Sequence, residues 1–547
     1  MNKIEQSLKE MIINAVKELY GLEFNYDEVV IEIPKEKAFG DYSTNMAMRL
    51  TKQLKKNPRI IADELSQAFD KSIADVEKCE IAGAGFINFF LNKASVASVI
   101  KVILDKKDAY GSSDFGQGVK YNLEYVSANP TGDLHPGHAR GAATGDATSR
   151  IMKFAGYDVT REYYINDAGN QINNMALSLQ ARYFQQFNQD LEMPKDGYYG
   201  KDIINIAQDL IAEVDDRYLH MSLEESLPYF RKYGLEKEID KLRLDLKTFN
   251  VEFDIWTSEQ SMYDQNKVAS GLEVLKSKGY TYELDGALWL KTTDFNDDKD
   301  RVLVKNDGSY TYLLPDIAYH LDKYNRGFDK LVDFFGADHH GYISRLKAAI
   351  QILGKNEDDL EVDIIQMARM LKDGQEYVMS KRSGKSISLR DLINEAGVDA
   401  IRYFFASKAA NTHMDLDLDI ATKKSNENPV YYAQYAHARM CSILNGYQQS
   451  EEVEIYDLLV NPKEIELIKH LNEFTNAVNE SAKLRQPHRI CNYIQKLAAL
   501  FHSFYGECKI ISDDINLTNQ RYDLVKGSQI VLKNALSLIG VSAPEKM

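Results

Sequence analysis

The sequence has few cysteines, no long apolar run and no excess of positive charge, and each absence narrows the class of protein. Its cysteines, Cys79, Cys441, Cys491 and Cys508, are scattered and form no Cys-x-x-Cys pair. This argues against a disulfide framework and against a structural zinc site. Scarce, unpaired cysteines fit a reducing cytoplasm, where we expect this protein to act.

The chain also lacks any stretch of about 18 apolar residues, so no membrane span is expected. The first residues, Met1 to Glu5, bring an acid early, and no apolar run follows them. We therefore expect neither a signal peptide nor a transit peptide. The net charge of −16 counts against a nucleic-acid partner without excluding one, because affinity depends on the phosphates that local Lys and Arg neutralise.

A length of 547 residues suggests roughly three domains. Residues 1–112 are predicted to form an α+β domain and residues 113–424 a Rossmann-like parallel-sheet domain. A helical insertion is expected at about 170–295. Residues 425–547 show apolar positions at helical spacing and predict an all-α bundle.

Two strand–turn–helix units support the parallel sheet. Val119–Val126 alternates apolar and polar residues, a helix follows as far as Ala155, and Asp158–Ile165 is the next predicted strand. Leu331–Phe335 begins a second unit, which turns at Gly336–Gly341 into a helix. Such units form parallel sheets with ligand sites at the carboxyl ends of their strands.

His135-Pro136-Gly137-His138 lies between the first strand and its helix. The helix N-terminus suits phosphate, the two imidazoles can donate hydrogen bonds to it, and Gly137 leaves room for a flat ring. Taken alone, a His-x-Gly-His sequence is more often a pair of loop histidines without a function.

Met379-Ser380-Lys381-Arg382-Ser383-Gly384-Lys385 is a second candidate, a short basic segment before a helix that Ser388 caps. A lysine on such a segment can neutralise the pyrophosphate that leaves a nucleotide triphosphate. Taken alone, the segment is more often a solvated basic loop.

Together, the two motifs resemble those of class I aminoacyl-tRNA synthetases. Further segments resemble the arginyl-tRNA synthetase family over nearly the whole chain: Ser127–Gly132, Arg161–Gln171, Pro315–His320, Gly336–Gly341, Asp399–Phe404 and Ser425–Tyr432. The resemblance implies an ATP-dependent ligase that joins L-arginine to tRNA(Arg) through an arginyl-adenylate. It also implies that residues 1–112 bind the tRNA elbow and residues 425–547 the anticodon.

The resemblance implies roles for individual residues. His135, His138 and Lys381 are expected to be catalytic. ATP is expected to contact His135, Gly137, His138, Gly336, Asp338, Met379, Ser380 and Lys381. Arginine is expected to contact Glu124, Asn129, Tyr312, Asp316 and His340. A carboxylate pair suits the guanidinium because paired hydrogen bonds replace its water.

In the last domain, tRNA is expected to contact Tyr431, Tyr432, Gln434, Tyr435 and Arg439, since aromatic rings stack on unpaired bases. The alternative for each tyrosine is core packing. Phe39–Tyr42 resembles the family's elbow-binding domain. We expect a monomer.

Magnesium is expected to arrive with ATP, and no protein-held metal is expected. One position departs from the family pattern: Val378 stands where a lysine is usual before Met379. Two alternatives stay open, a class I synthetase for another amino acid and a catalytically weak homologue that binds tRNA.

Overall fold

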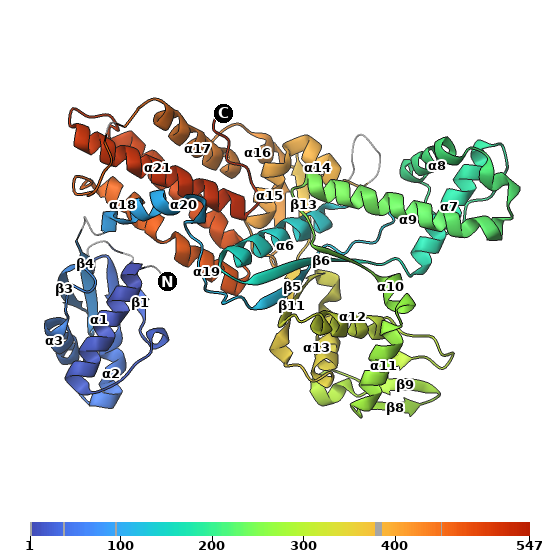
Figure 1. The fold of residues 1–547 in the computed structure, drawn as a ribbon, viewed down its shortest axis with the longest axis horizontal. Coiled ribbons are helices and arrows are strands. Elements are labelled where there is room, and N and C mark those ends of the chain that lie inside the picture. The colour runs from blue at the N-terminus through green and yellow to red at the C-terminus, as the bar shows by residue number, and fades with distance from the viewer. Residues whose placement is uncertain (1–2, 35, 37–38, 93–95, 378–385, 450) are drawn as a thin grey trace.

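The computed structural model describes residues 3–34, 36, 39–92, 96–377, 386–449 and 451–547, without the side chains of Asp338 and His340. A small antiparallel unit, a parallel sheet covered by helices and a helical bundle follow one another along the chain, and a helical arm extends from the sheet (Figure 1). Among the described residues, no helix has both the length and the apolar content needed to cross a membrane.

The N-terminal unit combines an antiparallel sheet with three helices. Its strands, in the order β1-β2-β4-β3, are Ile31–Glu32, Tyr42–Thr44, Phe86–Leu91 and Val76–Ala82. Its helices are α1 (Lys3–Tyr20), α2 (Met46–Leu54) and α3 (Pro58–Ala68). α3 begins where sequence rules place it, because Asn57 accepts a hydrogen bond from the Arg59 amide and Pro58 occupies the first turn.

The central sheet is parallel and has the strand order β12-β11-β5-β6-β7. These strands are Leu360–Ile365, Lys330–Gly336, Lys120–Glu124, Asp158–Ile165 and Ile255–Ser258. Helix α6 (Pro136–Phe154) lies above the sheet in Figure 1, and α12 (Leu313–Asn325) and α13 (Ile343–Ile352) lie below it. The predicted fold class, with a Rossmann-like core and a helical C-terminal part, is confirmed. The strand order reverses between β5 and β11, so a ligand crevice is expected there.

The segment at about 170–295 is less uniformly helical than expected. Helices α7 (Asn170–Gln186), α8 (Lys201–Val214) and α9 (Leu223–Thr248) form the arm. After them β7 joins the main sheet, and α10 (Glu259–Asp264) and α11 (Lys267–Ser277) follow. A second antiparallel sheet then contains β8 (Thr281–Leu284), β9 (Ala287–Leu290) and β10 (Arg301–Val304).

The sequence carries a signal for the β8–β9 hairpin, the Asp285-Gly286 pair that connects the two strands. Asp285 and Gly286 both have positive φ angles, 53° and 76°, as a tight hairpin turn requires. Tyr310–Leu314 forms no strand, because Tyr310 makes a single bridge to Val304 and α12 already begins at Leu313. The five residues of Tyr310–Leu314 are too few to show a clear strand or helix period.

The remaining chain leads from the sheet to the bundle. It contains a three-stranded sheet of β13 (Ala368–Lys372), β14 (Gln375–Glu376) and β15 (Met414–Asp417), and helices α14 (Leu389–Ala396), α15 (Val398–Ala406) and α16 (Leu418–Thr422). The bundle consists of α17 (Pro429–Asn445), α18 (Pro462–Asn472), α19 (Phe474–Leu484), α20 (His488–Glu507) and α21 (Ile515–Leu538). α19 and α21 contact α6, so the bundle packs directly against the helix that follows β5.

Candidate active site

The two histidines form a compact cap on α6. The Nδ1 atom of His135 accepts hydrogen bonds from the Gly137 and His138 amides, at 3.0 and 3.3 Å. The His138 Nδ1 atom accepts from the His135 amide at 3.4 Å, and the two rings stack with centroids 3.6 Å apart. A Cβ on Gly137 would lie 2.8 Å from the His135 ring. The cap itself therefore needs glycine at position 137.

The hydrogen bonds of this cap fix the tautomers of both imidazoles. Because each Nδ1 atom accepts a hydrogen bond, each neutral ring carries its proton on Nε2, from which it can donate. Burial lowers the pKa of His135, and burial together with His135 lowers the pKa of His138 to about 3. Both rings are therefore neutral near pH 7 and offer hydrogen-bond donors without a positive charge.

Three acidic residues lie side by side near the carboxyl end of β5, on the face of the sheet where α12 packs. Asp333, Glu124 and Glu162 are neighbours in the strand register. Helix α12 and the residue after it supply a cation for each acid: His320, Lys323 and Arg326. A buried acid needs such a partner, since an unpaired buried charge is strongly unfavourable.

Lys323 is the centre of this network. Its Nζ atom lies 2.6 Å from Glu124 Oε2 and 3.2 Å from Asp333 Oδ1, and its side chain is buried. Burial acts to lower the pKa of Lys323, but Asp333 and Glu124 outweigh it and raise that pKa. Burial raises the pKa of Glu124, whereas Lys323 opposes that shift. We take the pair as ionised, because a buried charged lysine needs a counter-ion at this distance.

His320 forms the second charged link. Its Nε2 atom lies 2.8 Å from Asp333 Oδ2, and its Nδ1 atom lies 3.1 Å from Asp316 Oδ1. Burial alone would lower its pKa, but Asp333 and Asp316 raise the pKa of His320 to about 10. The ring is therefore an imidazolium at neutral pH, held between two carboxylates.

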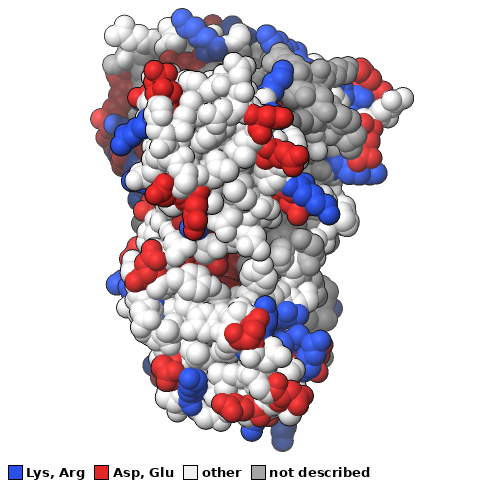
Figure 2. All heavy atoms as spheres, turned by 90° about the vertical axis from the view of Figure 1, so that its right-hand side faces the viewer, with Lys and Arg blue, Asp and Glu red and all other residues white. Residues whose placement is uncertain are grey.

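A cavity of about 400 Å³ opens beside this network at the switch point between β5 and β11. Its wall includes Glu124, Asp333, Asp316, Glu259, Tyr164 and Tyr342. Burial, with the charges of Asp167 and Asp316, raises the pKa of Glu259 to about 7. On the face that Figure 2 shows, the surface is hollowed between two lobes, and acidic side chains lie in the hollow. An acidic lining of this kind favours a cationic ligand over an anionic one.

The expected arginine-binding residues divide into two groups. Glu124 and Asp316 line the acidic cavity, as does Tyr312, whose side chain is 90% exposed at its mouth. Asn129 is exposed instead and donates a hydrogen bond to Gln171 at 2.8 Å. The side chain of His340 lies outside the described residues, although its backbone is in a 3₁₀ turn after β11.

The expected ATP-binding residues are only partly described. Gly336 ends β11 and lines the acidic cavity. His135 lines a second cavity, of about 790 Å³, between the loop at Gly197–Gly200 and the start of α14. Met379, Ser380, Lys381 and the departure at Val378 lie outside the described residues, as does the side chain of Asp338. Within the part of the chain that the structure describes, Glu124 ends β5 and His135 lies in the loop that follows, but these two residues line separate cavities.

Several residues of the acidic site carry no recognisable sequence signal. Lys323, Asp333 and Glu259 come from α12, β11 and α10, and each is an ordinary charged residue in its own segment. Asp333 interrupts an apolar strand, which is the one local hint of a special position. Lys323 and Glu124 are separated by 199 positions in the chain.

Of the predicted tRNA-contacting residues, the three tyrosines form an aromatic cluster, and Gln434 and Arg439 lie outside it. The Tyr431 and Tyr435 rings stack at 6.3 Å, and His502 lies against Tyr435 and Tyr432 at 6.0 and 4.9 Å. Gln434 is only 8% exposed and donates to Asp399 and Ser542. Gln434 therefore does not belong to that surface.

Arg439 lies further along α17. Its guanidinium bonds the Tyr505 hydroxyl and lies over that ring, at 4.8 Å from the centroid.

The parallel sheet and the His-Pro-Gly-His cap define the catalytic domain of a class I tRNA synthetase. A family model described as "tRNA synthetases class I (R), catalytic domain" matches residues 99–441. A model for the arginyl-tRNA synthetase N-terminal domain matches residues 6–91, and a DALR anticodon-binding model matches residues 433–547.

Whole-chain comparisons narrow the class to one family. The chain is 54% identical to the arginine–tRNA ligase of Bacillus pumilus, covering 100% of this chain and 99% of that relative. It is 53% identical to arginine–tRNA ligase 1 of Halalkalibacterium halodurans, covering 100% of both.

Solved structures agree with this result. A putative arginyl-tRNA synthetase from Campylobacter jejuni, 35% identical, superposes with a TM-score of 0.77 over 84% of this chain and 100% of that one. The Thermus thermophilus arginyl-tRNA synthetase, 21% identical, shares the fold with a TM-score of 0.76 over 99% and 100%. The chain belongs to the arginine–tRNA ligases, the enzymes that join arginine to tRNA.

Proposed function

We propose that the acidic cavity binds the arginine side chain during ATP-dependent formation of arginyl-tRNA(Arg). Four carboxylates, those of Glu124, Asp333, Asp316 and Glu259, face two protein cations there, so the cavity retains negative charge for a guanidinium. Asp316 is the more available of the two predicted ligands. Both oxygens of Glu124 already have partners, Lys323 at 2.6 Å and Ser127 at 3.0 Å.

The α-amino and carboxylate end of arginine is assigned to Asn129, and the mouth of the cavity to Tyr312 and His340. This orientation points the carboxylate toward the start of α6, where adenylate must form. In the first step that carboxylate attacks the α-phosphate of ATP and expels pyrophosphate. In the second step the tRNA ribose hydroxyl takes the arginyl group and AMP leaves.

We assign ATP to the N-terminal end of α6. The Nε2–H groups of His135 and His138 donate to phosphate oxygens as charge develops, and their neutrality avoids the cost of burying extra charge. Gly137, Gly336 and Asp338 are assigned to the nucleotide, and Met379, Ser380 and Lys381 to closure over its phosphates. Magnesium arrives on ATP, whose phosphates supply the oxygen ligands that it prefers.

The tRNA is assigned to both ends of the molecule, with residues 1–112 at the elbow and residues 425–547 at the anticodon. The ring of Tyr435 is 41% exposed beside Tyr431 and His502, and its exposed part offers a surface on which a base can stack. Tyr432 and Arg439 complete the proposed surface, whereas Gln434 is left out because it is buried. The catalytic part corresponds to residues 113–424. We propose that the enzyme acts as a cytoplasmic monomer.

The observation that carries this proposal is the acidic cavity at the end of the strand that leads into the imidazole cap. Its test is ATP–pyrophosphate exchange with each of the twenty amino acids, with and without total tRNA. We expect exchange with arginine and with no other amino acid. Exchange with another amino acid would reassign the cavity, and no exchange in the presence of tRNA would favour a catalytically weak tRNA-binding homologue.

A further inference from the structure

The loop between β5 and α6 begins with two strained residues. Val126 has a φ angle of 71° and Ser127 one of 40°, both in the left-handed region. A β-branched residue such as valine rarely adopts this conformation, because its side chain crowds the backbone. Strain of this kind persists only where surrounding contacts enforce it, and it concentrates at functional sites.

The contacts that enforce this conformation come from β5 and β6. Ser127 Oγ donates to Glu124 Oε1 at 3.0 Å and accepts from the Tyr164 amide at 3.1 Å. One residue further on, the hydroxyl of Tyr163 donates to the Ala128 carbonyl at 2.8 Å. Tyr163 is fully buried, and that carbonyl belongs to the peptide that joins Ala128 to Asn129.

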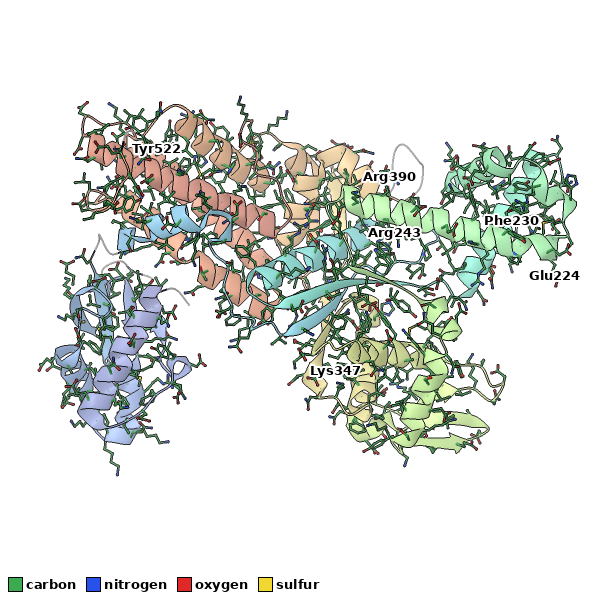
Figure 3. All side chains as sticks on the ribbon, viewed as in Figure 1. Glu224, Phe230, Arg243, Lys347, Arg390 and Tyr522 are labelled. Carbon is green, nitrogen blue, oxygen red and sulfur yellow. The ribbon has the colours of Figure 1, made fainter. Side chains whose placement is uncertain are left out.

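Tyr163 is itself held by a stack that leads to the surface. Its ring lies parallel to Trp256, with centroids 4.3 Å apart, and edge-on to Phe253 at 5.3 Å. The Arg243 guanidinium covers the outer face of Trp256 at 4.8 Å. Figure 3 labels Arg243 on the stretch of α9 that runs above the sheet. This packing leaves the Tyr163 hydroxyl little freedom, so it defines where the Ala128 carbonyl lies.

We infer that Tyr163 is a positioning residue for arginine: its hydroxyl fixes the strained loop so that Ser127 and Asn129 face the substrate. The inference rests on the proposed arginine site. Tyr163 does not touch the cavity, because its ring is enclosed on the far side of the loop and its hydroxyl ends at the Ala128 carbonyl. It acts through the loop alone.

The test is Tyr163→Phe, which removes one oxygen and keeps the ring stack. Without this hydrogen bond the loop is less ordered before arginine binds, so part of the binding free energy is used to order it. The KM for arginine should therefore rise roughly threefold to tenfold, the effect of one hydrogen bond, while kcat and the KM for ATP stay close to those of the parent enzyme. The dissociation constant for arginine from calorimetry should rise by the same factor.

Tyr110→Phe is the matched control. Its hydroxyl is also buried and also donates to a backbone carbonyl, that of Leu471 at 2.9 Å, but it lies between α5 (Val99–Lys106) and the bundle. It should lose comparable stability and leave the KM for arginine unchanged. An equal rise in that KM for both variants would reduce Tyr163 to a structural role and overturn the inference.

A third variant separates this inference from the arginine site on which it rests. Asp316→Asn should raise the KM for arginine if the cavity is assigned correctly. If Asp316→Asn does so and Tyr163→Phe does not, the positioning role is wrong and the site stands. If neither variant changes the KM for arginine, the site assignment itself is wrong, and the inference is overturned with it.

Discussion

At the scale of single residues, the acidic cavity is defined by which carboxylates remain open to a ligand. Glu124 is tied to Lys323 and Ser127, and Asp333 to Lys323 and His320. Among the described residues, Asp316 forms an ion pair with His320 and lies on the cavity wall. The carboxylate best placed to gain a new partner is therefore that of Asp316.

Asp316→Asn is predicted to raise the KM for arginine about 30-fold or more, because losing one member of a desolvated charge pair costs about 2 kcal/mol or more. Steady-state kinetics with arginine as the varied substrate measures this effect. Asp322→Asn is the control, since Asp322 lies on the same helix but pairs with Lys267 and Arg326 outside the cavity. Equal effects of the two substitutions would count against the role of Asp316.

His320 gives a prediction about pH. Asp333 and Asp316 raise its pKa to about 10, whereas in the unfolded chain it is about 6.5. The stability that its charge contributes is complete below pH of about 6.5 and is lost as the pH rises through about 10. Urea unfolding between pH 7 and 10.5 should therefore show a smaller fall in stability for His320→Gln than for the parent, and parallel curves would refute the charged state.

At the scale of elements, α6 is the part that joins the catalytic cap to the sheet. Its N-terminus carries the stacked imidazoles, and its middle packs against the sheet through glycine. A Cβ on Gly145 would lie 2.4 Å from the Tyr125 ring, whereas a Cβ on Gly141 would meet nothing within 4 Å. The close approach of α6 to Tyr125, the residue after β5, thus depends on Gly145 and not on Gly141.

Gly145→Ala is predicted to destabilise the protein by about 1–3 kcal/mol, because Tyr125 cannot move out of a packed core without strain. It should also lower kcat, since α6 carries His135 and His138. Gly141→Ala is its matched control on the same helix, and it should stabilise the protein by about 0.5–1 kcal/mol. Denaturant unfolding tests both, and a reversal of this order would contradict the packing described here.

At the scale of the whole molecule, one buried arginine joins distant parts of the chain. Arg402 on α15 donates to Asp146 on α6 at 2.5 Å, to the carbonyls of Phe249 and Asn250 after α9, and to that of Ile539 after α21. Its side chain is completely buried. The catalytic helix, the arm and the bundle therefore share one set of hydrogen bonds.

Arg402→Met is predicted to cost about 3 kcal/mol of stability, because the buried carbonyls of Phe249 and Ile539 lose this donor at about 1–3 kcal/mol each, while Asp146 keeps its ion pair with Arg150. The catalytic part and the bundle should lose stability together. Arg369→Met, which breaks an exposed pair with Asp415, should change stability by less than about 1 kcal/mol. Urea unfolding with near-ultraviolet dichroism measures both, and a small effect of Arg402→Met would show that the parts are only loosely joined.

The sequence by itself determined the elements around the cap. Strand, turn and helix from Val119 to Ile165 follow from local periodicity and from residues whose backbone or hydrogen-bonding preferences act over a few positions. The resemblance supplied Glu124 and Asp316, and both line the same cavity. Short elements such as β7, with four residues, gave too little pattern to be recognised.

Only the tertiary structure decided how the charges are paired and which polar residues are buried. Lys323 meets Glu124 and Asp333 because β11 lies next to β5 and α12 crosses both, an arrangement that no local pattern specifies. Gln434 has the same helical context as the exposed Tyr435, yet the chain after α21 covers it. Local preferences act between neighbours in sequence, whereas the partner of a buried charge depends on which distant segments share the interior.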